Sequence, residues 1–145
     1  RCVMGKLAVS DVDEVLFQTT LRVQVGDVNY GGHLANDAVL RLCHEVRMRW
    51  LAGLGWSETD AGGAGLIMAD AAVQYLAQGF YGDELSAEMG VEDIGKGGFA
   101  LLFRLTRIAD GKVLARARTG MVCFDYGKQR VCRLPLALKT ALEAV

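Results

Sequence analysis

Residues 27–37 read DVNYGGHLAND, and a run of apolar periodicity follows them as far as Leu54. The two adjacent glycines permit backbone shapes and close approaches that a side chain would block. We expect Asn36 or Asp37 to cap a helix, because each carries a side-chain oxygen that can accept a hydrogen bond from an orphan backbone N–H. Apolar residues then recur at spacings of three and four, which predicts a helix from about 36 to 54, roughly 28 Å long.

The start of this expected helix is a candidate reaction site. Free N–H groups and the positive end of the helix dipole favour a developing oxyanion there. Asp27 and Asn29 stand just before it and are ordinary turn formers by residue type. In a functional role, Asp27 is a carboxylate near the substrate and Asn29 is a neutral hydrogen-bonding group. An amide is neither a nucleophile nor a base at neutral pH, which excludes Asn29 from both roles.

Two further polar residues of this region have both an ordinary and a functional interpretation. His33 follows the glycines, and a lone histidine is more often a hydrogen-bonded structural residue than a catalyst, although an unperturbed imidazole can exchange protons near neutral pH. Glu45 lies one helical turn after Arg41 and one before Arg49, which favours ordinary ion pairs. No set of His, Cys and carboxylate residues has the spacing of metal ligands, so no metal is expected.

The stretch resembles the opening of the central helix in hotdog-fold acyl-CoA thioesterases of the 4-hydroxybenzoyl-CoA thioesterase type. Their pattern is roughly Asp-x-Asp-x-x-Gly-His-x-Asn-Asn, followed by a helix that carries Glu-x-Arg. Residues 27–37 and the Glu-Val-Arg at 45–47 match it, and YGDEL at 81–85 and LPL at 134–136 also resemble the family. The likeness runs from about residue 17 to 142. One departure matters for the chemistry: Asn29 stands where several members have an Asp that acts as nucleophile or base.

The resemblance implies roles for individual residues. The backbone N–H of Asn36 would polarise the thioester carbonyl. Glu45 would act on a substrate bound by the partner subunit, and Asp27 is the alternative candidate for the catalytic carboxylate. The remaining motif positions are expected to bind substrate: Tyr30, Gly31, Gly32 and Asp37.

Basic residues of the predicted turns and tail have two interpretations. They are Lys96, Lys128, Arg130 and Arg133. They belong either to an ordinary solvated surface or, as the resemblance implies, in part to a rim that holds the phosphates of coenzyme A. The sequence alone leaves this choice open.

Size and composition exclude several classes of protein. The 145 residues are the usual size of one domain, and 52% of them are hydrophobic, which is enough for a sizeable core. The net charge of -1 argues against a nucleic-acid-binding protein. No apolar run reaches the ~20 residues of a membrane span, and residues 1–13 lack the apolar region of a signal peptide. Cys43 and Cys123 sit in apolar patterns as buried thiols, and a reducing cytoplasm is the simplest compartment.

Alternation of apolar and polar residues predicts five strands. They are expected at about 17–25, 66–77, 85–92, 99–108 and 113–123. Asp110-Gly111 is a strong hairpin turn, and Pro135 suits the first turn of a short final helix. Residues 1–14 show no clear period and are expected to form a loose lead-in.

The order of strand, long helix, four strands and short helix predicts an α+β domain over residues 1–145. Hairpin-length connections require a largely antiparallel sheet, which matches the hotdog fold that the resemblance implies. Such a sheet has open edges that must be paired or covered. Together with the high apolar content, this predicts a homodimer or a homotetramer.

The leading functional prediction is hydrolysis of an acyl-CoA thioester by water, with no cofactor beyond the CoA of the substrate. Enoyl-CoA hydration on the same fold is an alternative, because hydratases carry Asp-x-Asn-Pro-x-His. Here His33 falls one residue too far on, and no proline follows Asn29. A second alternative is a non-catalytic acyl-CoA-binding module, which the loss of the usual Asp makes conceivable.

Overall fold

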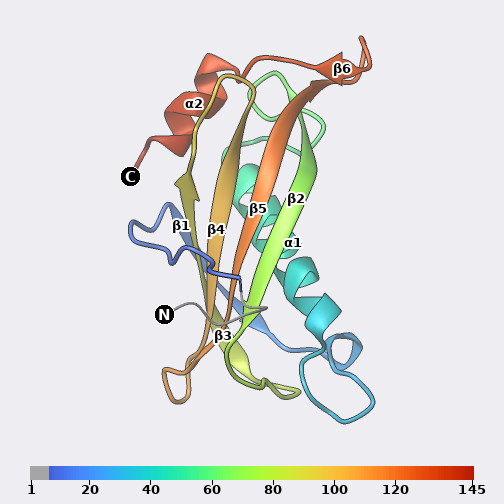
Figure 1. The fold of residues 1–145 in the computed structure, drawn as a ribbon, viewed down its shortest axis with the longest axis vertical. Coiled ribbons are helices and arrows are strands. Elements are labelled where there is room, and N and C mark those ends of the chain that lie inside the picture. Colours follow the sequence, from blue (N-terminus) through green and yellow to red (C-terminus); the bar gives the residue numbers. More distant parts are fainter. Residues whose placement is uncertain (1–6) are drawn as a thin grey trace.

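The structure is a computed structural model that describes residues 7–145. A long helix lies against one face of a twisted antiparallel sheet (Figure 1), and the strands follow the order β1-β3-β4-β5-β2, with β6 paired to β5. The elements in chain order are β1 (Phe17–Arg22), the 3-10 helix η1 (Val25–Asp27), α1 (Asn36–Gly53), β2 (Gly65–Tyr75), β3 (Glu84–Glu92), β4 (Gly98–Arg107), β5 (Val113–Asp125), β6 (Arg130–Val131) and α2 (Leu136–Leu142). The expected α+β hotdog architecture is confirmed.

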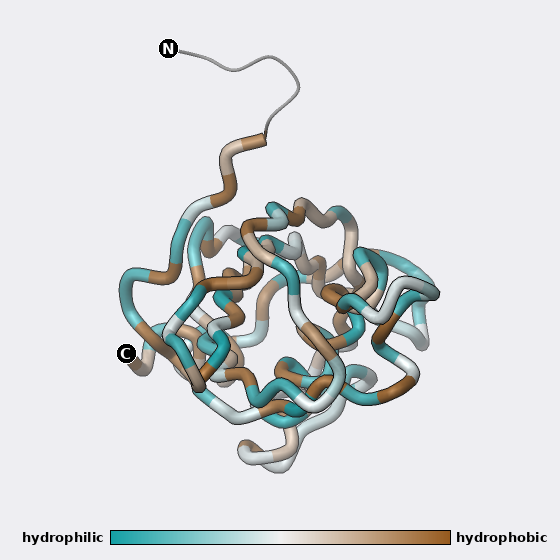
Figure 2. Tube along the Cα trace, turned by 90° about the horizontal axis from the view of Figure 1, so that it is seen from below, coloured by the Kyte–Doolittle hydropathy of each residue, from teal (hydrophilic) through white to brown (hydrophobic). Residues whose placement is uncertain are grey.

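The core lies between α1 and the sheet because both present an apolar face to it. Hydrophobic and hydrophilic residues alternate along much of the chain (Figure 2), as expected for strands with one buried face. Leu101, Phe103 and Met89 from the central strands are fully buried, as are Val46 and Leu51 from α1. The hairpin between β4 and β5 forms at the predicted position, where Gly111 adopts a positive φ of 72°.

The long helix matches its predicted range, but its predicted cap is wrong. The N-cap residue is Ala35, and no side chain caps this end. Asn36 and Asp37 are already helical, and the Asp37 carboxylate accepts a hydrogen bond from Arg41 at 2.9 Å. The Ala35 N–H donates to the carbonyl of Asp27 at 2.8 Å. A tertiary contact therefore fixes the entry to the helix, which a capping side chain was expected to do.

Two strand predictions also need correction. The first strand ends at Arg22, three residues before the expected end, because the chain turns into the 3-10 helix Val25–Asp27. The sheet gains a sixth, two-residue strand at Arg130–Val131 that follows a turn after β5. Pro135 is the N-cap of α2 and does not lie inside its first turn.

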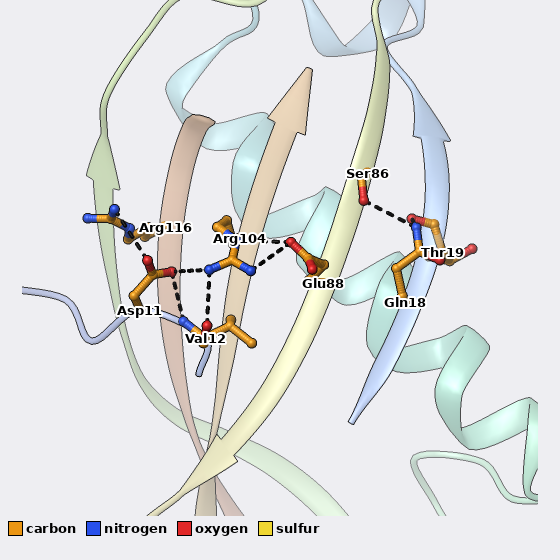
Figure 3. A network of polar contacts seen from close by, with 8 residues as sticks. All are labelled: Asp11, Val12, Gln18, Thr19, Ser86, Glu88, Arg104 and Arg116. Carbon is orange, nitrogen blue, oxygen red and sulfur yellow. Dashed lines mark hydrogen bonds and ion pairs between the residues drawn. The ribbon is translucent and has the colours of Figure 1, made fainter. Parts of the chain in front are cut away.

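The segment before β1 is fastened to the sheet face that lies away from α1. Val9 and Val12 are buried there, although a loose lead-in was expected. The Asp11 carboxylate pairs with Arg104 at 2.8 Å and with Arg116 at 3.4 Å (Figure 3). A Cβ at Gly90 would stand 2.9 Å from the carbonyl of Glu14 and 3.1 Å from Val12 Cγ1, so a glycine is required beneath this segment. We call residues 9–14 the outer strap. The expectation for residues 1–6 lies outside the described part of the chain.

Candidate active site

A tight turn precedes α1, and Asn29 organises it. Its side-chain oxygen Oδ1 accepts hydrogen bonds from the N–H groups of Gly31 at 3.0 Å and His33 at 3.1 Å. Its own N–H donates to the His33 carbonyl at 2.8 Å. Gly32 has a φ of +83°, which a residue with a side chain rarely adopts. Asn29 therefore acts here as a turn former through its side-chain oxygen.

The turn is docked on the segment that leads into β3. His33 forms an antiparallel bridge with Phe80, and their rings meet edge to face at 5.2 Å. The Leu34 N–H donates to the Gly79 carbonyl at 2.8 Å. A Cβ at Gly79 would lie 3.1 Å from the Cβ of Leu34, so this approach also depends on a glycine. The contacts hold the start of α1 against the end of β2 and the chain after it.

A depression of about 330 Å³ opens at this junction, and three of the predicted site residues line it. Asn29, His33 and Asn36 form its polar side. Apart from Tyr75 and Gln78, its remaining wall is apolar and contains Leu34, Val39, Leu76, Ala77 and Leu114. Tyr75 also lines it and donates its hydroxyl hydrogen to the Asn36 carbonyl at 3.0 Å.

The Asn36 amide is the notable donor at this depression. Its N–H donates to no acceptor within residues 7–145, as expected for the first residue of a helix that lacks a capping side chain. An unpaired N–H at the positive end of an 18-residue helix stabilises negative charge on a nearby oxygen. The apolar part of the lining can hold the hydrocarbon or aromatic part of a ligand. The depression therefore suits a polar carbonyl joined to an apolar group.

The two predicted carboxylates lie in a different depression. Asp27 and Glu45 line a separate hollow of about 290 Å³ with several cationic and polar side chains. The Asp27 carboxylate accepts the Gln24 N–H at 2.9 Å, and Glu45 pairs with Arg49 at 2.7 Å. Asp27 does not continue the first strand: that strand ends at Arg22, Asp27 belongs to the 3-10 helix, and Val28 after it is extended.

The remaining motif residues do not line the first depression. Tyr30 is fully exposed, and Gly31 and Gly32 lie at the exposed tip of the turn. Asp37 points toward Arg41, whose hydrogen bond holds the pKa of the Asp37 carboxyl below its ordinary value. Within this chain, Tyr30 and the two glycines shape the turn, and Asp37 makes the ion pair expected of two residues one helical turn apart.

The sequence interpretation missed a polar cluster on α1. Glu58, in the loop after the helix, pairs with His44 at 2.7 Å and with Arg47 at 2.5 Å. Burial alone would raise the pKa of Glu58, but hydrogen bonds from His44 and Arg47 outweigh it and lower that pKa. Arg47 is only 6% exposed, and its place on the apolar face of the helix was the available signal. Tyr75 was missed because nothing in its strand indicates contact with a residue 39 positions earlier.

Three basic residues without ion-pair partners in the described part of the chain gather at the other end of the molecule. Each arginine of α1, β1, β4 and β5 has a carboxylate within 3.4 Å. Within residues 7–145, Lys96, Arg133 and Lys139 pair with none, and they line one depression of about 400 Å³. The Leu134 N–H donates to the Lys96 carbonyl at 2.7 Å, which joins the two chain segments that carry Lys96 and Arg133. We call this hollow the basic depression.

Two other expectations can be compared with the described residues. Within residues 7–145, no three His, Cys, Asp or Glu side chains are grouped as metal ligands would be. In the same part of the chain, neither helix combines the length and the apolarity that a membrane span requires.

Comparison with known proteins identifies the family to which this chain belongs. The model of the family described as thioesterase-like superfamily matches residues 23–142. No curated protein matches the chain significantly. A 1,4-dihydroxy-2-naphthoyl-CoA thioesterase from Synechocystis is 23% identical, with 89% of this chain and 96% of that chain covered and a TM-score of 0.80.

Two more solved structures share the architecture. A gentisyl-coenzyme A thioesterase is 19% identical, with 87% of this chain and 99% of that chain covered and a TM-score of 0.75. A Staphylococcus aureus protein solved in complex with CoA is 16% identical, with 94% and 87% covered and a TM-score of 0.79. At such identities these likenesses establish the fold.

Proposed function

This chain belongs to the thioesterase-like superfamily, and from that premise we propose how it hydrolyses acyl-CoA thioesters to the free acid and CoA. One observation carries the proposal. The unpaired N–H of Asn36 stands at the N-terminus of α1, beside a depression whose remaining wall is largely apolar. The acyl group lies against that wall, and the thioester oxygen accepts the Asn36 N–H. As water attacks, negative charge develops on this oxygen, where the helix terminus stabilises it.

The group that activates water is either His33, which lines the depression, or a carboxylate from outside it. No carboxylate lines the depression. Glu45 lies nine residues after Asn36 on the same helix, about 13 Å farther along its axis. That separation is too large for Glu45 and Asn36 of one chain to act on the same thioester carbon. Glu45 therefore acts on the substrate held by a partner subunit, and His33 is the alternative within the chain.

A homodimer supplies this partner. The strand β2 is an edge of the sheet, and its Ile67 and Met68 side chains are 37% and 44% exposed. An exposed edge of 11 residues is a ready template for another strand. Antiparallel pairing of two β2 edges about a two-fold axis covers both edges and closes the assembly. The same pairing places the start of one protomer's α1 near the opposite end of its partner.

The basic depression then becomes the site for the phosphates of CoA. It cannot serve the active site of its own protomer, because it lies beyond the far end of α1. Lys139 of this depression belongs to α2, and α2 packs on the loop after α1, where a Cβ at Gly62 would be 3.1 Å from the Leu138 N. The helix itself is about 27 Å long. Two-fold pairing brings the partner's basic depression to the correct end. Lys96, Arg133 and Lys139, free of carboxylates, can there bind phosphate oxygens.

One pair of variants tests the central step. Asn36→Pro removes the N–H, and proline fits here because it is favoured at the first helical position and Ala35 is already extended, with φ -71° and ψ 146°. Asn36→Ala keeps the N–H and is the matched control. We expect Asn36→Pro to lower turnover by about 10²–10³-fold, and Asn36→Ala to change it little, with thiol release from a panel of acyl-CoAs as the measurement.

The outcomes separate the alternatives. Equal activity of the two variants would refute the role of the Asn36 amide, provided that thermal melts show both to be folded. Binding of acyl-CoA without thiol release by the unmodified chain would indicate a binding module. Consumption of an enoyl-CoA double bond without thiol release would indicate a hydratase.

A further inference from the structure

Two cysteines of this chain lie directly opposite each other on neighbouring segments. The pairing of β5 with β6 matches Phe124 with Val131 and Asp125 with Arg130. The next step of the same register matches Cys123 with Cys132, and the Cys132 N–H donates to the Cys123 carbonyl at 3.0 Å. Residues opposite each other on antiparallel strands carry their side chains on the same face. Both thiols indeed pack against the same core cluster.

The spacing of this pair suits a covalent bond. Opposed residues of an antiparallel ladder have Cα atoms about 4.5–5.5 Å apart, and disulfides bridge Cα distances of about 4.4–6.8 Å. Gly97 allows the close approach of the surrounding segments, since a Cβ there would stand 3.2 Å from the Cys132 carbonyl oxygen. Its own carbonyl accepts the Cys123 N–H at 2.9 Å. The two thiols are thus held on a backbone fixed on both sides.

The thiols differ in access to solvent. Cys123 is fully buried, whereas Cys132 is partly exposed. Burial raises the pKa of the Cys123 thiol to about 11, and the neighbouring Cys132 contributes in the same direction. Cys43 is also buried, but it lies on α1. An oxidant from solvent therefore reaches Cys132 first.

We propose that Cys123 and Cys132 are a dithiol site that closes to an intramolecular disulfide on reaction with a small disulfide oxidant such as oxidised glutathione. The Cys132 thiolate attacks one sulfur of the oxidant, which forms a mixed disulfide and releases one thiolate. The Cys123 thiolate then attacks the Cys132 sulfur, which forms the internal disulfide and releases the second thiolate. Two electrons pass from the protein to the oxidant, and the two thiol protons end on the released thiols.

The bond would fasten β5 to the segment that enters the basic depression. Arg133 follows Cys132 directly, and the Leu134 N–H donates a hydrogen bond to the Lys96 carbonyl. Closing the short loop between residues 123 and 132 restricts the unfolded chain. Oxidation should therefore raise the melting temperature, and the added restraint lies next to the proposed phosphate site. The proposal itself depends only on the cysteine geometry and not on the proposed function.

The test treats the full-length protein with oxidised glutathione at several pH values and maps its cysteines by mass spectrometry after alkylation. We expect a peptide pair joined through Cys123 and Cys132, a melting temperature higher by about 5 °C, and full reversal by reductant. The reaction should speed up as pH rises toward the raised pKa of Cys123.

Two variants sharpen the result. Cys123→Ser should stop at a stable mixed disulfide on Cys132, whereas Cys43→Ser should form the internal disulfide as the unmodified chain does. A lasting mixed disulfide on Cys132 with Cys123 still reduced in the unmodified chain would overturn the proposal. So would the absence of any oxidation at Cys132, or a linkage that involves Cys2 or Cys43.

Discussion

At the scale of single residues, amino-acid type alone did not predict several structural roles, because hydrogen-bond and ion-pair partners determine them. Asn29 holds the turn with its side chain, which residue type did suggest. Ala35 occupies the cap position, which no residue preference would indicate, because its N–H is satisfied by the Asp27 carbonyl. The His44–Glu58 pair joins residues 14 positions apart and follows no local pattern. Local chemistry thus predicted the turn, and only tertiary contacts define the cap and the cluster.

The base of the reaction is the prediction that belongs to this scale. Because the chain has turned before Val28 and Asp27 is bound by the Gln24 N–H, we expect Glu45 to activate water in the partner's site. Glu45→Gln should lower turnover by about 10²–10⁴-fold without unfolding, and Asp27→Asn should cost much less. Steady-state kinetics with circular dichroism measures both. Near-full turnover in both variants would exclude both carboxylates as the base, and the next variant to measure would then be His33→Gln.

At the scale of elements, periodicity was a dependable guide wherever burial dictated the pattern. α1 and the strands β3, β4 and β5 match their predicted ranges closely because each has one face in the core. The outer strap has no such period. Buried Val9 and Val12 and the Asp11 ion pairs hold it in place, and these contacts join residues more than 90 positions apart, such as Asp11 and Arg104.

The outer strap yields a pH prediction. Burial alone would raise the pKa of Asp11, but the Val12 N–H, Arg104 and Arg116 lower it overall. A carboxyl whose pKa is lowered by folding stabilises the protein above its unfolded pKa, and this contribution is lost as pH falls through the folded value. Asp11→Asn should cost about 1 kcal/mol at neutral pH, after discounting for partial exposure, and nothing in strong acid.

The matched control for this prediction is Asp13→Asn, because Asp13 is exposed and makes no ion pair within residues 7–145. Melting temperatures of the three proteins between pH 7 and pH 3 provide the measurement. Parallel curves for Asp11→Asn and the unmodified chain would contradict the assignment of this linkage to Asp11.

At the scale of the whole molecule, the two ends of α1 have complementary properties. One end carries the unpaired Asn36 N–H, and the other carries the basic depression. The sequence predicted an oligomer from its open edges and offered the basic residues as a choice between solvated surface and phosphate rim. It could not reveal that three cations share one hollow, because they come from the β3–β4 turn, the tail and α2.

A mixed-dimer experiment tests this arrangement. Asn36→Pro protomers lack the proposed oxyanion donor, and protomers carrying Lys96→Ser, Arg133→Ser and Lys139→Ser lack the proposed phosphate site. Each homodimer should be poorly active at low acyl-CoA concentration. Random mixing should restore about a quarter of full activity, since half of the dimers then carry one intact site. Without a shared site, mixing restores nothing.

The control for charge is Lys112→Ser, which removes an exposed cation that also lacks a carboxylate partner but lies in the turn between β4 and β5. Its affinity for CoA should match that of the unmodified chain, whereas the triple variant should lose CoA affinity at least tenfold and keep its affinity for pantetheine, which has no phosphate. Equal CoA affinities in the triple variant and the control would refute the phosphate site.

The strand order β1-β3-β4-β5-β2 also determines when the chain can fold during its synthesis. β1 pairs only with β3, and β2 pairs only with β5 among the named strands. No two of the elements completed by Tyr75 can therefore begin a sheet together. During translation, the apolar face of α1 emerges with no sheet to cover it, and it must wait for the β3–β4–β5 meander, whose short hairpins have the least loop-closure entropy to overcome. The nascent chain is consequently most prone to self-association, and most dependent on chaperones, between the completion of α1 and the arrival of β5.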